Sequence, residues 1–216
     1  MTRESSDPEL RVVSGDGCAQ KPRERIVETA QDLFHRHGIR GVGVDAIAEA
    51  AGTNKMTLYR HFGSKDDLVI EYLNCKARKS DETWARIQTA HPQDPAGQLY
   101  AFVDEAARFI AEDKRGCDLA NAAVELTEEG HPGLAVIGEF KTRQRNRLAV
   151  LCKAAGASQP DLLADTLTLL IEGARVSRRS VGTEGPSGNL CKTSEAVITS
   201  FGVPARKKRR APAKAV

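Results

Sequence analysis

Residues 44–65 read VDAIAEAAGTNKMTLYRHFGSK, a stretch that predicts two short helices joined by a tight turn. Ile47 and Ala51 fall on one face of the first helix, where small and apolar side chains let a second helix approach closely. Gly52 can adopt the left-handed conformation that ends a helix, and Asn54 can cap the helix that follows. The pattern therefore predicts a helix-turn-helix.

The second helix of this unit, which starts near Lys55, has one apolar and one polar face. Leu58 and Phe62, four residues apart, are expected to be buried together. The other positions carry amide, hydroxyl and basic groups that can touch phosphates and base edges. Ser64, followed three residues later by Asp67, resembles a capping box and predicts a further helix.

The run from Ile47 to Leu68 closely resembles the DNA-binding domain of the TetR family of bacterial transcriptional regulators. The resemblance is specific over roughly residues 22–73 and extends to the rest of the chain only by architecture. It implies that Asn54, Lys55, Thr57 and Tyr59 lie at the major groove of double-stranded DNA, with Tyr59, His61 and Lys65 on phosphates. The candidate DNA-binding residues are Val44, Thr53, Asn54, Lys55, Thr57, Leu58, Tyr59, His61 and Lys65. Val42 and Gly43 stand where the family often has Thr and Ser, so a hydroxyl cap is expected to be missing, and Met56 replaces a usually small residue.

Pattern and charge divide the chain into four parts. We expect a disordered segment at 1–21, a three-helix DNA-binding domain at 22–64, a larger helical domain at 65–202 and a disordered tail at 203–216. The formal net charge is +3, and six positive charges crowd into the last eleven residues: Arg206, Lys207, Lys208, Arg209, Arg210 and Lys214. The tail could attract DNA phosphates without reading sequence, or it could only aid solubility.

The larger domain shows helical periodicity and no strand alternation, so the predicted fold class is all-α. Its middle helices carry aromatic faces with a few polar groups, the composition of a small-molecule pocket, although plain core would look the same. The candidate ligand-binding residues are Phe102, Phe109, Cys117, Asn121, Glu125 and Phe140. A buried Glu125 would favour a cationic or hydrogen-bonding effector.

The helix predicted from Pro160 to Arg178 is apolar on nearly every side of its middle. Such a helix needs cover all round, which a second subunit can supply, so we expect a homodimer; a central helix in a monomer is the alternative. Residues 194–201 would form the neighbouring interface helix. The candidate interface residues are Leu163, Leu167, Leu170, Ala174, Val197 and Phe201.

Patterns typical of catalysis or metal binding are absent from the sequence. His35 and His37 point to different faces of a helix, and the glycines of residues 183–188 follow a helix rather than a strand. We therefore expect no enzyme, no catalytic residue, no metal and no cofactor. The five scattered cysteines suit a reducing cytoplasm, and no apolar run is long enough to enter a membrane.

The sequence thus predicts a cytoplasmic bacterial transcriptional regulator, bound to the nucleoid when it holds DNA. We expect a repressor on a palindromic operator, released when a small-molecule effector moves the helix that begins after Ser64. Three alternatives stay open: an architectural DNA-binding protein without a ligand, a transcriptional activator, and a small helical enzyme that carries a helix-turn-helix.

Overall fold

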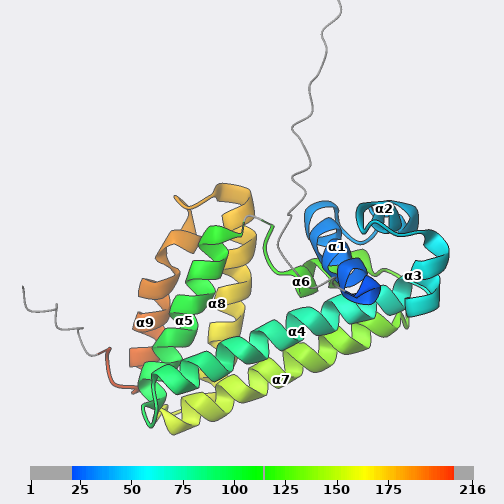
Figure 1. The fold of residues 1–216 in the computed structure, drawn as a ribbon. Helices are drawn as coiled ribbons and strands as arrows, with labels where there is room; N and C mark the ends of the chain where they lie inside the picture. The colour runs from blue at the N-terminus through cyan, green and yellow to red at the C-terminus, as the bar shows by residue number, and fades with distance from the viewer. Residues whose placement is uncertain (1–20, 114, 207–216) are drawn as a thin grey trace, which may run out of the picture.

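The computed structural model describes residues 21–113 and 115–206 of the 216-residue chain. Over these residues the chain forms nine α-helices and one short 3₁₀ helix, without a strand (Figure 1). The all-α prediction is therefore confirmed. The expectations for residues 1–20 and 207–216 lie outside the described residues.

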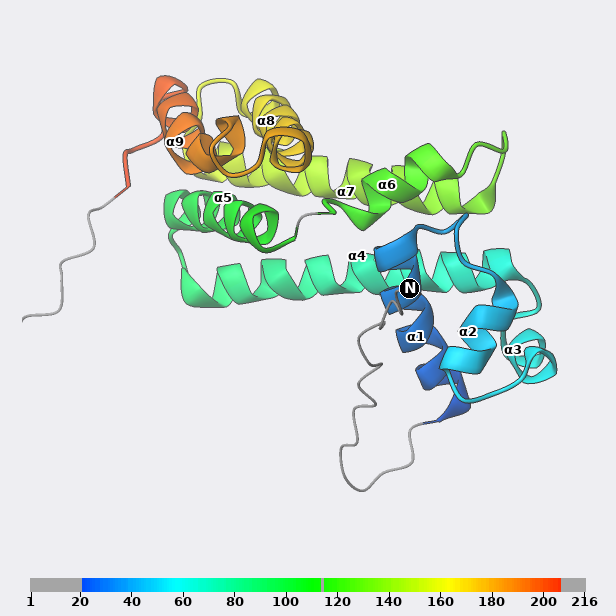
Figure 2. The same ribbon diagram turned by 90° about the horizontal axis from the view of Figure 1, so that it is seen from above.

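Two long helices, α4 (Lys65–Ala90) and α7 (Pro132–Ala154), lie side by side along the molecule (Figures 1 and 2). Three short helices pack at one end of α4: α1 (Pro22–His37), α2 (Val44–Ala50) and α3 (Lys55–Phe62). At the other end stand α5 (Pro95–Glu112), α8 (Pro160–Val181), η1 (Pro186–Asn189) and α9 (Leu190–Ser200). Between the two groups, α6 (Asp118–Glu125) packs on α4 and α7 next to α1.

The N-termini of α3 and α4 have the predicted side-chain caps, and the turn before α3 has the predicted glycine conformation. The side-chain oxygen of Asn54 accepts a hydrogen bond from the Thr57 N–H at 2.9 Å, and Ser64 Oγ accepts one from the Asp67 N–H at 3.0 Å. These bonds satisfy donors that the first turn of a helix leaves open. Gly52 has a φ of +60°, a conformation that a side chain would strain. Both predicted caps are confirmed.

One apolar core connects the short helices to the rest of the chain. Phe34 of α1 packs edge-to-face on Tyr72 of α4, with ring centroids 5.4 Å apart. Leu58 of α3, Leu119 of α6 and Phe140 of α7 belong to the same buried cluster. A three-helix unit of this size buries little apolar surface alone, so α4, α6 and α7 supply the cover that fixes it.

The predicted dimer interface on α8 needs correction. Leu163, Leu167 and Ala174 are buried inside the subunit against neighbouring helices of the same chain. The other three predicted interface residues, Leu170, Val197 and Phe201, are half-buried and pack against these same cores. Periodicity shows that α8 is apolar all round, but it does not say which side the subunit itself covers.

The face of α8 that remains open carries a different apolar stripe. Leu162, Leu169 and Val176, spaced seven residues apart, are all exposed, Leu169 by 73%. Positions seven apart lie on the same side of a helix, so these side chains form a continuous ridge. An exposed apolar ridge of this kind is typical of a contact surface.

The predicted boundary of the basic tail is four residues too early. Val203 is buried, and Tyr100 Oη donates a hydrogen bond to the Pro204 carbonyl at 3.0 Å. Both terminal guanidinium nitrogens of Arg206 lie 2.8 Å from the carboxylate of Asp104. Residues 203–206 therefore belong to the folded unit.

Two further observations concern only the part of the chain described above. No helix there is long and apolar enough to cross a lipid bilayer. No group of three or more His, Cys, Asp or Glu side chains lies close enough together to hold a metal ion there.

Candidate nucleic-acid interface

The apolar face of α3 fixes the helix to its domain. Leu58 is completely buried and Phe62 nearly so, with the Arg23 guanidinium 5.0 Å from the Phe62 ring centroid. The assignment of Leu58 to DNA contact is therefore corrected, because its side chain faces the core. Val44, at the start of α2, is also buried, and Gly43 before it supplies no side-chain cap, as expected.

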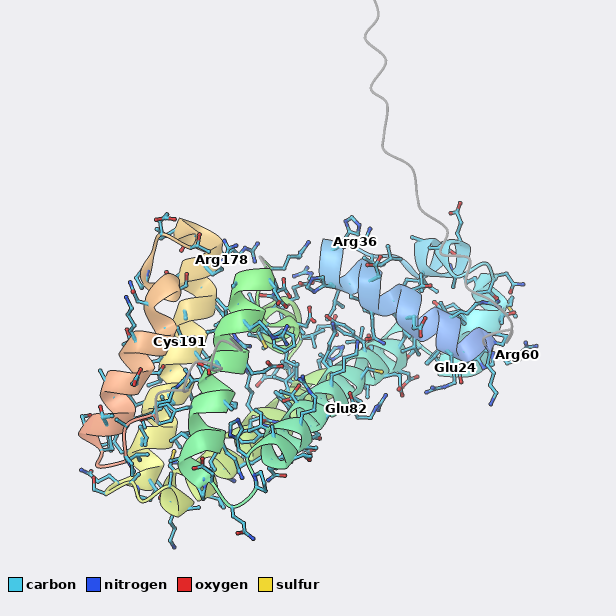
Figure 3. All side chains as sticks on the ribbon, turned by 60° about the vertical axis from the view of Figure 1, so that its left-hand side comes forward. Glu24, Arg36, Arg60, Glu82, Arg178 and Cys191 are labelled. Atoms are coloured by element: carbon cyan, nitrogen blue, oxygen red, sulfur yellow. The ribbon has the colours of Figure 1, made fainter. Side chains whose placement is uncertain are left out.

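The opposite face of α3 is open. Met56 is 79% exposed and Tyr59 37% exposed, and His61 is exposed beside them. Arg60, on the same helix, lies at the opposite end of the molecule from Cys191 of α9 (Figure 3). The helix thus presents hydrogen-bonding, basic and apolar groups at the outer end of the protein, where a duplex can approach.

Lys55, the first residue of α3, forms an ion pair with Asp45 of α2. Its Nζ lies 3.1 Å from Asp45 Oδ2, and both side chains are more than half exposed. Exposed ion pairs contribute about 0–1 kcal/mol, so a phosphate can replace this carboxylate at little cost. Asn54 is exposed, while Thr53 and Thr57 are half-buried.

Lys65, predicted to contact a phosphate, has a partner within the protein. Its Nζ donates a hydrogen bond to the Ile39 carbonyl at 2.7 Å. Burial lowers the pKa of the Lys65 ammonium, against the opposing effect of Asp66 and Glu125. Lys65 therefore holds the loop between α1 and α2, and a phosphate contact would have to share this ammonium.

A cluster of charges links α1 to α6. Asp118 Oδ1 lies 2.7 Å from His35 Nδ1, and Asp118 Oδ2 lies 2.6 Å from Lys76 Nζ. Burial raises the pKa of the Asp118 carboxyl, but Lys76 and His35 together outweigh burial and lower it. The sequence gives no sign of this cluster, because its members lie on three helices far apart along the chain.

A second link joins the end of α6 to the loop after α1. The Glu125 carboxylate accepts a hydrogen bond from the Arg40 N–H at 3.0 Å. Gly38 has a φ of +78°, which strains any other residue, and an added Cβ would lie 2.7 Å from a Glu125 oxygen and displace that side chain. The loop that leads into the helix-turn-helix is therefore held by Glu125 of α6 and by Lys65 of α4 at two adjacent residues, Arg40 and Ile39.

A cavity of about 330 Å³ lies between these two links. Its walls come from α1, the α1–α2 loop, α4, α6, the segment before α6 and the end of α8. Of the six predicted ligand-binding residues, Asn121 and Glu125 line it. The sequence assigned both to a pocket, but it placed that pocket within the larger domain.

The other four predicted ligand-binding residues do not line this cavity. Phe102 stacks on Trp84 with ring centroids 4.7 Å apart, and Phe140 is buried in the core. Phe109 is 48% exposed beneath the Arg108 guanidinium, and Cys117 precedes the first residue of α6. The helical spacing of aromatic residues therefore did not predict which of them line a cavity and which are buried in the core.

Both the sequence and the fold of this chain are similar to those of known proteins. A family model described as bacterial regulatory proteins, tetR family, matches residues 26–72. A TetR-family transcriptional regulator from Streptomyces coelicolor superposes with a TM-score of 0.78 at 26% identity, over 83% of this chain and 95% of that one. The helix-turn-helix region of this chain belongs to the TetR family, and the chain shares its fold with a TetR-family regulator. The match with a solved structure extends well beyond the helix-turn-helix.

Curated TetR-like relatives are similar over parts of their length. An uncharacterized HTH-type transcriptional regulator of Mycobacterium tuberculosis is 28% identical over 42% of this chain and 44% of that protein. The probable acrEF/envCD operon repressor of Escherichia coli is 26% identical over 72% of this chain and 73% of that protein. The chain thus matches less than half the length of the first of these relatives. The relatives are transcriptional regulators by name.

Proposed function

We propose that this protein is a transcriptional repressor of the TetR family that binds palindromic operator DNA as a homodimer and responds to a small-molecule effector. The observation that carries the proposal is the open face of α3. Lys55 and Tyr59 project from a helix that Leu58 and Phe62 fix to the core. A short helix presented in this way fits the major groove, and its side chains can reach base edges and phosphates. The Escherichia coli relative is named a probable operon repressor, which supports repression rather than activation.

The exposed ridge on α8 supports the homodimer. Leu162, Leu169 and Val176 leave a large apolar surface in water in the isolated subunit. A second copy of the chain can cover this ridge with its own, since a two-fold axis brings the same patch of both subunits together. Two α3 helices in one particle then require two half-sites related by a dyad, which is the symmetry of a palindromic operator.

The two links from α6 support effector control. Asp118 contacts α1, and Glu125 contacts the loop before α2. A ligand that moves α6 would therefore act on the position of α3 through these contacts. Such a ligand shifts the DNA-bound population only if it binds the two arrangements with different affinity.

Two of the alternatives predict different behaviour. An architectural protein would bind DNA with little preference among sequences. An enzyme would catalyse a reaction, whereas the relatives are named as transcriptional regulators. We place the repressor in the bacterial cytoplasm, where its operator is accessible.

Selection of genomic fragments by the purified full chain tests the proposal. We expect a small set of fragments that share an inverted repeat and that outcompete random DNA of equal length by at least about a thousandfold. Fragments retained in proportion to their length, with no shared motif, would overturn the repressor in favour of an architectural role. Expression from a selected promoter should rise when the gene is deleted, and a fall would indicate an activator.

A further inference from the structure

The cavity between α1 and α6 is built from both parts of the protein. Phe34 and Ile39 come from the helix-turn-helix side, and Asn121 and Glu125 come from α6. Its volume of about 330 Å³ is at the lower end of the range for small-molecule sites. A ligand in this position would touch the DNA-binding domain directly.

The two carboxylates of the cavity are already engaged. Asp118 is paired with His35 and Lys76, and Glu125 accepts the hydrogen bond from the Arg40 N–H. Lys76 offsets the charge of Asp118, and the Glu125 carboxylate lies near enough to the Lys65 ammonium to raise the pKa of that group. The expectation that Glu125 favours a cationic or hydrogen-bonding effector stays a prediction, and the other charges of the cavity point to an anionic group.

The cavity also has two guanidinium groups, and these have no partner within the described part of the protein. Arg115, just before α6, and Arg179, near the end of α8, both line it. Within residues 21–113 and 115–206, neither guanidinium makes a hydrogen bond or an ion pair. A guanidinium is always charged at neutral pH and binds a carboxylate with two parallel hydrogen bonds. Since Lys76 is paired with Asp118 and Lys65 lies near Glu125, the two guanidinium groups give the cavity an excess of positive charge.

The remaining wall is apolar. Phe34 and Tyr72 meet edge-to-face, and Ile39 lies beside them. Burial raises the pKa of the Tyr72 hydroxyl, with Asp118 adding to the effect, so this ring carries no charge at neutral pH. A molecule that fits must combine an anionic group with an apolar body.

We propose that this cavity is the effector site and binds a small organic carboxylate, with the carboxylate on Arg115 and Arg179 and the apolar body against Phe34 and Ile39. This inference deepens the proposed effector response and rests on it. The ligand would contact α1, α6 and α8 at once. Its binding would therefore change the contacts of Asp118 and Glu125 that hold the helix-turn-helix, and with them the affinity for DNA.

Calorimetric titration of the full chain without DNA tests the site. The probes are benzoate, phenylacetate, cinnamate and hexanoate, with benzamide as the neutral analogue, benzylamine as the cationic one and inorganic phosphate as an anion without an apolar body. We expect saturable binding of at least one carboxylate, and binding at least about tenfold weaker for benzamide, benzylamine and phosphate. Equal binding of a carboxylate and its amide, preferred binding of benzylamine or phosphate, or no binding of any of the four carboxylates would overturn the proposal.

Arginine variants locate the binding. Arg115→Gln and Arg179→Gln should each weaken carboxylate binding about tenfold or more, the scale of one missing charge-assisted hydrogen bond. Lys153→Gln with Lys192→Gln, which removes two exposed charges from α7 and α9, is the matched control and should leave binding unchanged. Unchanged binding in both arginine variants, with circular dichroism of a folded protein, would contradict the assigned site.

The two proposals fail separately. Carboxylate binding is measured without DNA, and operator selection is measured without a carboxylate. A protein that selects an inverted repeat but binds no carboxylate keeps the repressor and loses this site. A protein that binds benzoate through Arg115 but selects no DNA keeps the site and loses the repressor.

Discussion

Asp118 Oδ1 lies 2.7 Å from His35 Nδ1, and this contact joins the first turn of α6 to the last turn of α1. Lys76 of α4 approaches the other oxygen of the same carboxylate. The carboxylate is mostly buried, so water screens these contacts little. The helix-turn-helix is therefore tied to the larger domain by a polar cluster as well as by the shared apolar core.

Asp118→Asn should destabilise the protein at neutral pH by about 1–3 kcal/mol, because Lys76 would keep its charge in a half-buried place without a counter-ion. The folded-state pKa of Asp118 is lowered, so its stabilisation is present above the ordinary carboxyl pKa and lost as the pH falls through the lowered value. Urea unfolding of both proteins should show a difference that is constant near neutrality and shrinks below about pH 4. A difference that grows on acidification would contradict the assigned sign.

Asp165→Asn is the control for this effect. Arg145 lowers the pKa of the Asp165 carboxyl too, but this ion pair lies on the surface. Its removal should change the free energy of unfolding much less than Asp118→Asn does. Equal losses in the two variants would mean that the α1–α6 contact is no stronger than an exposed pair.

Tyr59→Ala should weaken operator binding by about 1–3 kcal/mol, the scale of a good base or phosphate contact. Tyr59 is 37% exposed on the open face of α3, so its removal leaves the core intact. Phe109→Ala removes an aromatic ring of similar exposure from α5 and should leave DNA affinity unchanged. Fluorescence anisotropy with a labelled operator measures both. An unchanged affinity for a folded Tyr59→Ala protein would remove this residue from the interface.

Leu169→Glu should convert the dimer to a monomer that remains folded, because it places a charge on the exposed ridge of α8. Val150→Glu puts the same charge on an equally exposed position of α7 and should leave the dimer intact. Leu167→Glu, at a fully buried position, should instead unfold the subunit. Light scattering after size-exclusion chromatography separates these results. A monomeric unmodified protein would refute the dimer.

Removal of residues 207–216 should flatten the dependence of DNA affinity on salt by about one unit of slope for each phosphate that the tail neutralises in the full chain. The cut follows Arg206 because that residue is bound to Asp104, so the folded part stays complete. Preference for the operator over random DNA should survive. Loss of that preference at an unchanged slope would show that the tail reads sequence, and an unchanged slope with unchanged preference would support a role in solubility only.

Local chemistry made the helix-turn-helix predictable. Asn54 and Ser64 cap the helices at which the sequence places them, and Gly52 adopts the expected positive φ. These features depend on residues within one or two turns of each other, where side-chain chemistry alone limits the backbone. The same reasoning predicted α3 and the burial of Leu58 and Phe62 on one of its faces. It was wrong to assign Leu58 to DNA contact as well.

Contacts between distant elements were not predictable in the same way. The pattern of α8 shows apolar positions all round, yet only packing reveals that Leu167 is buried while Leu169 is exposed. Arg115 and Arg179 line one cavity although no local rule relates them. The sequence predicts that Lys65 contacts a phosphate, but in the structure its ammonium donates a hydrogen bond to the Ile39 carbonyl. Contacts of this kind join residues that are far apart in the sequence, so local patterns in a single sequence do not predict them.

Hydroxyl-radical footprinting of the full chain on a selected operator tests most directly the central claim that two α3 helices read two half-sites. We predict two protected patches related by a dyad on one face of the duplex, with centres about 34–36 Å apart or a multiple of that spacing, and loss of both patches with Tyr59→Ala. Phe109→Ala should leave the pattern unchanged. Even protection along the duplex, or two patches that persist in the Tyr59→Ala protein at the same concentration, would contradict the account.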